Sequence, residues 1–188
     1  MRRVVVAVEV TLNGVMSPVD WAFQFMNEER GRYARDLLFA SDALLMGRET
    51  YEVFANFWPA RTSADDGPGE EGFNHRINSL PKYVASTTLK EPLGWNATLI
   101  QGDIAKEVAK LKQQPGQDIL MYGAGRLAHT LMQHGLVDEL RVWVYPVLWE
   151  SGVRLLNDAS DLPALRLVDT KVFSSGLVVL TYQPEKKE

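Results

Sequence analysis

From its start to about residue 134, the chain alternates short apolar runs with segments of helical periodicity, and this alternation constrains the fold more than any other feature. The runs are too short for helices and rich in β-branched residues, so we expect buried strands. These expected strands are Val4–Val8, Ala43–Met46, Lys82–Ser86, Ala97–Ile100 and Ile119–Tyr122. The expected helices are Asn27–Ala40, a segment with Tyr51 and Phe54 that stops at Pro59, a segment marked by Ile104, Val108 and Leu111 that ends at Pro115-Gly116, and Gly125–His134. Strands that alternate with helices predict a parallel sheet with helices on both faces.

After Gly135 the alternation gives way to consecutive strands. Leu140–Pro146 alternates as a strand, and Leu165–Phe173 can pair with Leu177–Gln183 across the Ser-Ser-Gly turn between them. The sequence therefore predicts a three-layer α/β protein with about four helices. Its sheet is expected to be mixed, mostly parallel and eight-stranded, with an antiparallel C-terminal edge. We expect one domain over residues 1–184, followed by a charged tail at 185–188.

Composition excludes several classes of protein. The chain contains no cysteine, so disulfide scaffolds, thiolate nucleophiles and Cys-ligated metals are excluded. Its 20 basic and 24 acidic residues give a net charge of −4, which argues against a nucleic-acid partner. Glu9 interrupts the first apolar run too early for a signal peptide, and no run approaches the length of a membrane span. We expect a cytoplasmic protein with no membrane partner and, because no two histidines have metal-site spacing, no metal.

Residues 59–74 have the composition of a loop. They combine prolines and glycines with acidic residues and hold little apolar content. A loop of this length is either a tolerated, solvated insertion or a functional element, and we favour the solvated insertion.

Glycine and hydroxyl residues follow three of the expected parallel strands. These segments are Gly47-Arg48, Ser86-Thr87-Thr88 and Gly123-Ala124-Gly125. Ligands of such sheets bind beyond the carboxyl ends of the strands, so the convergence points to a binding site. Gly123 to Ala128 also fits the dinucleotide pattern G-x-G-x-x-G/A, in which a phosphate approaches a helix N-terminus. Taken singly, each turn could equally be a packing turn or a helix cap.

Acidic residues flank the first expected helix and are the candidate proton donors. Asp20 precedes this helix, and Glu28 and Glu29 lie in its first turn. Glutamates in a first helical turn are also favoured by the helix dipole without any catalytic role. No G-x-S-x-G or P-loop lysine motif is present, so hydrolase and P-loop kinase activities lack their usual signatures.

Five stretches in register resemble a known superfamily. They are Thr11–Gly14, Ala43–Tyr51, Asn78–Leu89, Ile119–Gly125 and Leu136–Val147, with Gly152 and Leu155–Leu156 beyond. Over nearly its whole length the chain resembles the dihydrofolate reductase-like superfamily. The similar branch is the C-terminal reductase domain of the bacterial bifunctional deaminase-reductase of riboflavin biosynthesis.

The resemblance implies a dimeric, NADPH-dependent reductase and assigns roles to residues. Phosphates would be held by Gly47, Arg48, Thr50, Gly123, Ala124 and Gly125, with Arg126 and Leu127 following. Ser86 and Thr87 would lie at the adenosine end, and Ala7, Gly14, Val15 and Met16 would border the nicotinamide. We place Trp21, Tyr51 and Phe54 on the substrate side.

The expected reaction transfers hydride to a C=N or C=O group of a small heterocycle, such as a ribosylaminopyrimidine. A pterin or dihydrofolate reductase is one alternative, and a nucleotide-binding sensor without turnover is another. The chain departs from the family pattern at Thr87, where an arginine is frequent, and at Gly123-Ala124, where folate reductases have two glycines. The folate reductases' carboxylate on the first helix has Glu28 as its nearest counterpart and Asp20 as the alternative.

Overall fold

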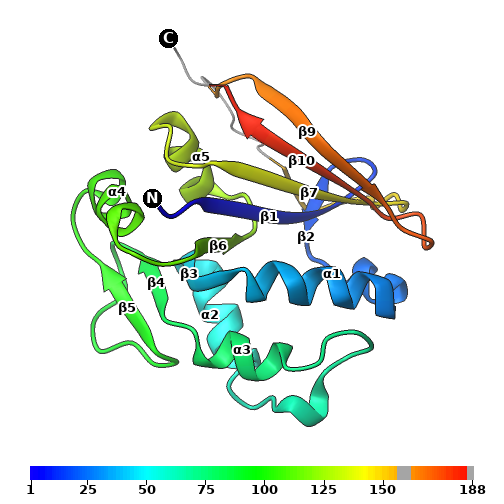
Figure 1. The fold of residues 1–188 in the computed structure, drawn as a ribbon, viewed down its shortest axis with the longest axis horizontal. Coiled ribbons are helices and arrows are strands. Elements are labelled where there is room, and N and C mark those ends of the chain that lie inside the picture. Colours follow the sequence, from blue (N-terminus) through cyan, green and yellow to red (C-terminus); the bar gives the residue numbers. More distant parts are fainter. Residues whose placement is uncertain (156–161, 186–188) are drawn as a thin grey trace.

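The fold is built on one large sheet, seen nearly edge-on in Figure 1. The computed structural model describes residues 1–155 and 162–185. The strands of this sheet are β1 (Val4–Thr11), β3 (Ser41–Gly47), β4 (Lys82–Ala85), β5 (Ala97–Ile100), β6 (Asp118–Tyr122), β7 (Glu139–Tyr145), β9 (Leu165–Val172) and β10 (Val178–Pro184). They lie in the order β5-β4-β3-β6-β1-β7-β10-β9.

The strand directions agree with the sequence. The pairs β1–β6, β1–β7, β3–β4, β3–β6 and β4–β5 are parallel. Strand β10 runs antiparallel to both β7 and β9. The predicted eight-stranded mixed sheet with an antiparallel C-terminal edge is therefore confirmed.

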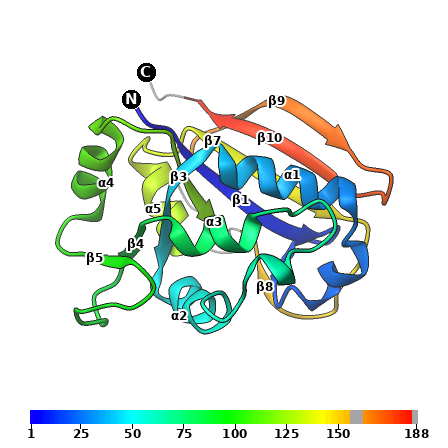
Figure 2. The ribbon, with the colours of Figure 1, turned by 60° about the horizontal axis from the view of Figure 1, so that its bottom comes forward.

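Helices cover both faces of the sheet, which confirms the three layers (Figure 2). They are α1 (Glu28–Phe39), α2 (Arg48–Phe57), α3 (Phe73–Ser79), α4 (Ile104–Gln113) and α5 (Arg126–Gln133). On one face, α1, α2 and α3 pack over a core that includes Val5, Leu38 and Ile77. On the other, α4 and α5 pack over a second core that includes Val6 and Leu131.

The described residues contain five α-helices rather than the expected four, because α3 was not predicted. This helix has only seven residues, and its N-cap, Gly72, has a left-handed conformation with no side-chain cap. The side chain of Asp66 instead accepts hydrogen bonds from the backbone of Gly72 and Asn74. A contact across six to eight residues leaves no local signal in the sequence.

Four further elements of the described structure were not predicted. They are the small sheet of β2 (Val15–Ser17) and β8 (Val153–Arg154) and the 3-10 helices Asp20–Phe25 and Ser63–Asp65. Each is too short to show a periodicity. Leu156 and the predicted charged tail beyond Glu185 lie outside the described residues.

Most of the loop over residues 59–74 is exposed or half-buried, as expected for a solvated insertion, but residues 68–70 within it pack closely against α1. Gly69 is buried, and a Cβ built on it would lie 2.3 Å from the Glu28 carbonyl oxygen. A Cβ on Gly31 would lie 2.0 Å from the Pro68 carbonyl oxygen. Glu70 then forms an ion pair with Arg30 at 3.1 Å. Two backbones in such close approach require glycine on both sides of the contact.

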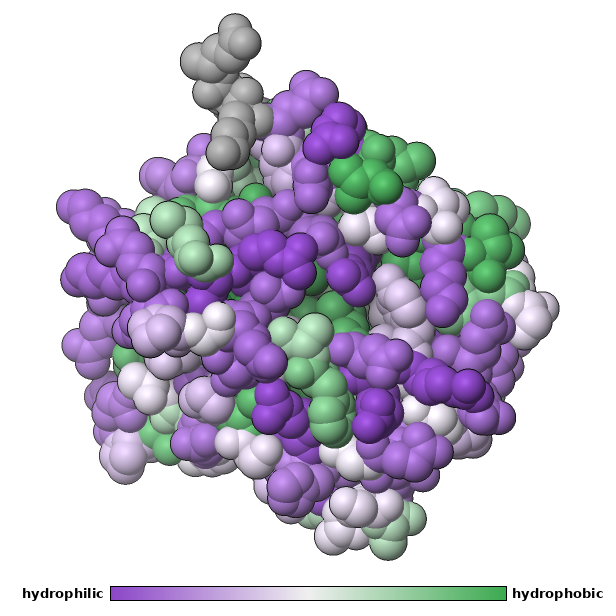
Figure 3. Space-filling model, viewed as in Figure 1, coloured by the Kyte–Doolittle hydropathy of each residue, from purple (hydrophilic) through white to green (hydrophobic). Residues whose placement is uncertain are grey.

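Edge strand β9 carries exposed apolar side chains. Leu167, Val168 and Val172 are each more than a third exposed. Figure 3 shows hydrophobic residues gathered over this strand, at the upper right of an otherwise mainly hydrophilic face. The expected dimer stays a prediction.

No helix among the described residues has the length and hydrophobicity to cross a membrane.

Candidate functional site

The structure brings the predicted cofactor segments together at one edge of the sheet. Strands β4, β3, β6 and β1 are consecutive neighbours and parallel. Ser86-Thr87 follows β4, Gly47 ends β3, and Gly123 follows β6. Ala7 lies beside them in β1, and its carbonyl oxygen accepts a hydrogen bond from the Gly123 amide at 2.8 Å. We call these segments, with Gly14–Met16, the strand-end site.

Two helices begin at this site without a side-chain cap. Gly47 is the N-cap of α2 and Gly125 is the N-cap of α5, and neither offers a side-chain acceptor to the first helical turn. The other two long helices are capped, by Asn27 and Asp103. Uncapped N-terminal N–H groups and the positive end of the helix dipole attract anions. Two such ends on adjacent strands suit a ligand with more than one phosphate.

Neither of these two capping glycines is required by the chain itself. Their φ angles are −79° and −82°, which any residue adopts. A Cβ built on either one meets no atom within 4 Å. A side chain at Gly47 or Gly125 would fill only open space above the helix ends. The residues present therefore fit a phosphate group that approaches the backbone closely.

Gly14 and Gly123 are glycines for a different reason. Both have a φ of +83°, so the turns after β1 and β6 favour glycine whatever binds there. In the first of these turns, the Gly14 amide donates a hydrogen bond to the Thr11 carbonyl oxygen at 2.9 Å. Val15 is fully buried beneath it and Met16 is half-buried, while Ala124 is 1% exposed.

The polar residues of the site differ in their freedom to bind a ligand. The exposed Arg48 forms an ion pair with Glu52 at 3.3 Å. Arg126 is exposed and makes no ion pair within the described ranges. The Ser86 hydroxyl accepts from the amides of Thr88 and Leu89, whereas Thr87 is exposed. Two further predicted residues, Thr50 and Leu127, are half-buried in the first turns of α2 and α5.

The predicted substrate residues lie on the α1–α2 face of the sheet. Phe54 packs against Tyr122, with ring centroids 5.7 Å apart, and Tyr122 is directly opposite Ala7 in the β1–β6 pair. Trp21 is only 2% exposed and contacts Tyr145 edge-on at 5.1 Å. The Tyr51 hydroxyl donates a hydrogen bond to the Gly94 carbonyl oxygen at 3.1 Å. Of these three residues, Phe54 is the one with a ring contact to Tyr122, the last residue of β6.

The predicted acids lie on the surface. Asp20 is exposed in the first turn of the 3-10 helix 20–25. Glu28 is exposed in the first turn of α1 and forms an ion pair with Arg32. Glu29 binds the backbone and hydroxyl of Ser174, which lower the pKa of its carboxyl. None of the three is hydrogen-bonded to a residue of the strand-end site.

A buried polar cluster that the sequence analysis missed lies on the same face as Ala7. The Glu9 carboxylate accepts from the Arg30 guanidinium at 2.5 Å and from the Tyr145 hydroxyl at 2.9 Å. Burial alone lowers the pKa of Arg30, but attraction to Glu9 and Tyr145 outweighs it and raises this pKa above its usual value. Burial raises the pKa of Tyr145 well above its usual range. The available signal was a single charge within the otherwise apolar run from Val4 to Val10.

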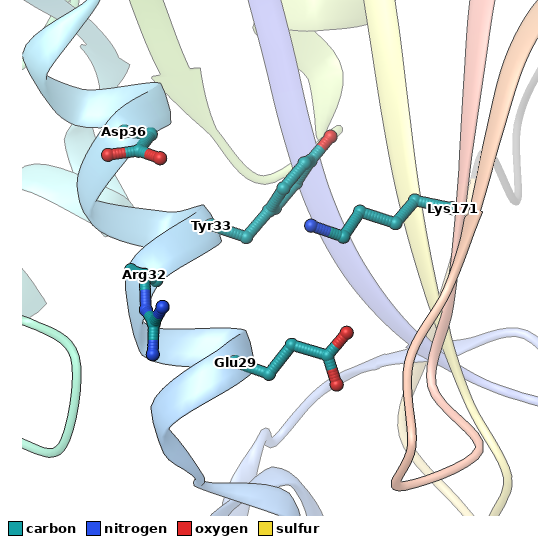
Figure 4. A pocket seen from close by; sticks show the side chains of 5 residues that line it. All are labelled: Glu29, Arg32, Tyr33, Asp36 and Lys171. Atoms are coloured by element: carbon teal, nitrogen blue, oxygen red, sulfur yellow. The ribbon is translucent and has the colours of Figure 1, made fainter.

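A separate pocket lies between α1 and β9, lined by Glu29, Arg32, Tyr33, Asp36 and Lys171 (Figure 4). Lys171 reaches from β9 toward the ring of Tyr33, with its ammonium 4.9 Å from the ring centroid. None of these lining residues belongs to the strand-end site. Because their charged groups are of both signs and contact other groups of the chain, we assign no ligand to this pocket.

The sheet order, the covering helices and the strand-end site together define a dihydrofolate reductase-like α/β protein. The chain belongs to the family described as the RibD C-terminal domain, which matches residues 2–179. It is 34% identical over 185 residues to the uncharacterized protein YyaP of Bacillus subtilis, covering 96% of this chain and 94% of that protein.

Solved structures share the fold at lower sequence identity. A Shewanella protein provisionally assigned to riboflavin biosynthesis superposes with a TM-score of 0.74 at 23% identity, over 99% of this chain and 100% of that one. A pyrimidine reductase-like protein of Corynebacterium diphtheriae gives 0.68 at 14% identity, over 99% and 93%. The Thermotoga maritima diaminohydroxyphosphoribosylaminopyrimidine deaminase/5-amino-6-(5-phosphoribosylamino)uracil reductase gives 0.64 at 15% identity, over 97% of this chain and 56% of that one.

Proposed function

We propose that this protein is an NADPH-dependent reductase acting on a C=N or C=O group of a small heterocycle of the aminopyrimidine type. The observation that carries the proposal is the pair of uncapped helix N-termini at Gly47 and Gly125, on adjacent strands, with open space where side chains would lie. The family and the pyrimidine reductase-like neighbour support this substrate class.

Bound NADPH would supply a hydride, and the chain's residues would hold and orient the reactants. The amides that begin α2 and α5 would bind the phosphates, with Arg48 and Arg126 as nearby cations. Ala7 would border the nicotinamide, because its small side chain lies beside Tyr122, the last residue of β6. The substrate would lie on the α1–α2 face, next to Phe54 and Tyr122.

Single-turnover oxidation of NADPH tests the proposal, with a panel of aminopyrimidines and pterins as substrates. We expect loss of the 340 nm absorbance with at least one aminopyrimidine. Oxidation by pterins alone would make the protein a pterin reductase. NADPH binding without oxidation by any panel member would instead support a nucleotide-binding module.

A further inference from the structure

The polar cluster around Glu9 has hydrogen-bonding capacity that the chain does not use. Arg30 Nη2 and the Tyr145 hydroxyl both donate to the same carboxylate oxygen, Oε1 of Glu9. Oε2 has no hydrogen-bond partner within residues 1–155 and 162–185. The Glu9 side chain is 26% exposed, so this oxygen belongs to a group that solvent or a ligand can reach. A carboxylate oxygen ordinarily accepts hydrogen bonds, and an unused one is a candidate ligand contact.

The rest of the cluster holds Glu9 in one orientation. Arg30 uses each of its three nitrogens, since Nη1 binds Glu70 at 3.1 Å and Nε reaches the Tyr145 hydroxyl at 3.4 Å. Tyr145 is fully buried, and the Arg30 side chain is 10% exposed. These fixed donors leave the Glu9 carboxylate little freedom to turn. Glu70 comes from the loop that packs on α1, so that loop helps to build the cluster.

Glu9 lies where a substrate next to Ala7 would meet it. Alternate residues of a strand share a face, so Glu9 is on the Ala7 side, about 7 Å further along β1. Across the β1–β6 pair, Tyr122 is opposite Ala7, and its buried hydroxyl has no partner in the described structure. Burial raises the pKa of Tyr122, so this group stays a neutral hydroxyl that can donate. The face thus offers an unused acceptor and an unused donor.

The charge of the cluster selects the kind of ligand. Two carboxylates, Glu9 and Glu70, share one guanidinium, so the cluster carries one net negative charge. A ligand group that donates through N–H would satisfy Glu9, whereas a group that only accepts would leave the carboxylate oxygen unpaired. A heterocycle with amino donors would match the accepting oxygen of Glu9.

We propose that Glu9 is the substrate-recognising residue, which accepts a hydrogen bond from an exocyclic amino group of an aminopyrimidine, with Arg30 and Tyr145 as positioning residues. This assignment rests on the proposed reductase function for its placement beside Ala7. It makes Glu9, rather than Asp20 or Glu28, the carboxylate in contact with substrate.

The test compares two probes, 5,6-diaminouracil and uracil, which differ by two amino groups. Their dissociation constants are measured by calorimetry on protein saturated with NADP⁺. Glu9→Gln should weaken diaminouracil binding about tenfold to hundredfold, as expected for one charge-assisted hydrogen bond. Uracil binding should change less than threefold, because uracil has no amino group to lose.

Because Glu9→Gln could fail to fold, Tyr145→Phe serves as a second variant. It keeps the Glu9–Arg30 pair and removes only one hydroxyl. It should lower the preference for diaminouracil over uracil by about threefold to tenfold, with thermal unfolding measured alongside. A merely structural role for the cluster would weaken both probes equally, and that result would overturn the proposal. An unchanged preference in both variants, or no binding of diaminouracil to the wild type, would overturn it as well.

Cofactor binding distinguishes failure of the proposed reductase function from failure of the proposed role of Glu9. If NADP⁺ and NADPH do not bind the wild type, the reductase function fails. The probe titrations are then repeated without cofactor, and Glu9-dependent binding of diaminouracil would still support the recognition role. If the cofactor binds normally to Glu9→Gln while diaminouracil affinity stays at the wild-type value, only the role of Glu9 is overturned.

Discussion

Ala7 and Gly123 are joined by a backbone hydrogen bond of 2.8 Å, from the Gly123 amide to the Ala7 carbonyl oxygen. This bond fixes the turn that leads into α5 against the middle of β1. The segment proposed for the phosphates and the residue proposed for the nicotinamide side are thereby held in one rigid frame. A cofactor bound by α2 and α5 would reach Ala7 without movement of the sheet.

An aspartate at Gly125 should separate helix stability from cofactor binding. Gly125→Asp supplies the missing N-cap acceptor, so the free energy of unfolding should rise by about 0.3 kcal/mol, the usual difference between aspartate and glycine at an N-cap. The new carboxylate would occupy the space proposed for a phosphate and repel it, so NADPH affinity should fall at least about a hundredfold. Calorimetry and urea unfolding measure the two effects.

Gln113→Asp is the control for this added charge, since Gln113 is exposed at the far end of α4. Its NADPH affinity should equal that of the wild type. Retained affinity in a folded Gly125→Asp protein would mean that no phosphate approaches α5.

The Arg48–Glu52 ion pair should restrain cofactor binding. Both side chains are 45% exposed, and the pair holds the Arg48 guanidinium on α2 at 3.3 Å. Glu52→Gln should release it and tighten NADPH binding up to about fivefold, the range of an exposed ion pair. Arg48→Ala should weaken NADPH binding about tenfold. Glu107→Gln breaks the comparable Lys110–Glu107 pair on α4 and should have no effect. If all three variants bind NADPH with the affinity of the wild type, Arg48 does not contact the cofactor.

Lys82 should make folding stability depend on pH in the alkaline range. Its side chain is fully buried, its ammonium donates to the Asn78 carbonyl oxygen at 2.7 Å, and burial lowers its pKa to about 8. Between pH 8 and the unfolded pKa of about 10.4, the unfolded chain binds more protons, so stability should rise with pH.

Burial raises the pKa of Tyr122 and Tyr145, which opposes this rise above about pH 10. The comparison with Lys82→Met is therefore made by urea unfolding from pH 8 to 9.5. The wild type should gain stability relative to the variant across this range. Parallel pH profiles would show that Lys82 titrates normally.

The contact between α1 and the loop should be sensitive to a single methyl group. In Gly31→Ala the new Cβ would lie 2.0 Å from the Pro68 carbonyl oxygen. We expect a loss of about 1–3 kcal/mol in unfolding free energy as the loop shifts and Glu70 leaves Arg30. Gly47→Ala, where a Cβ meets nothing within 4 Å, should stay within about 0.5 kcal/mol of the wild type. Similar unfolding free energies for the two variants would show that the loop moves away from α1 without a measurable loss of stability.

Much of the fold followed from local patterns. The buried strands could be predicted because short β-branched runs such as Val4–Val8 form most of each strand, here of β1 from Val4 to Thr11. The glycine segments could be predicted to form one site because parallel strands end at the same edge of a sheet. Helix α3 and the Glu9–Arg30–Glu70 cluster could not be predicted, because both depend on contacts between residues distant in the sequence. Gly47 and Gly125 could be distinguished from structural glycines only once their φ angles and surroundings were known.

Amide chemical shifts measured by NMR during an NADPH titration test the central proposal most directly. If the phosphates lie between α2 and α5, the largest shifts should fall on the first-turn amides of these helices, at Arg48, Glu49, Arg126 and Leu127. The amides of α4, which is capped by Asp103, should move little. Shifts concentrated elsewhere, or no shifts at millimolar NADPH, would contradict a cofactor site at these strand ends.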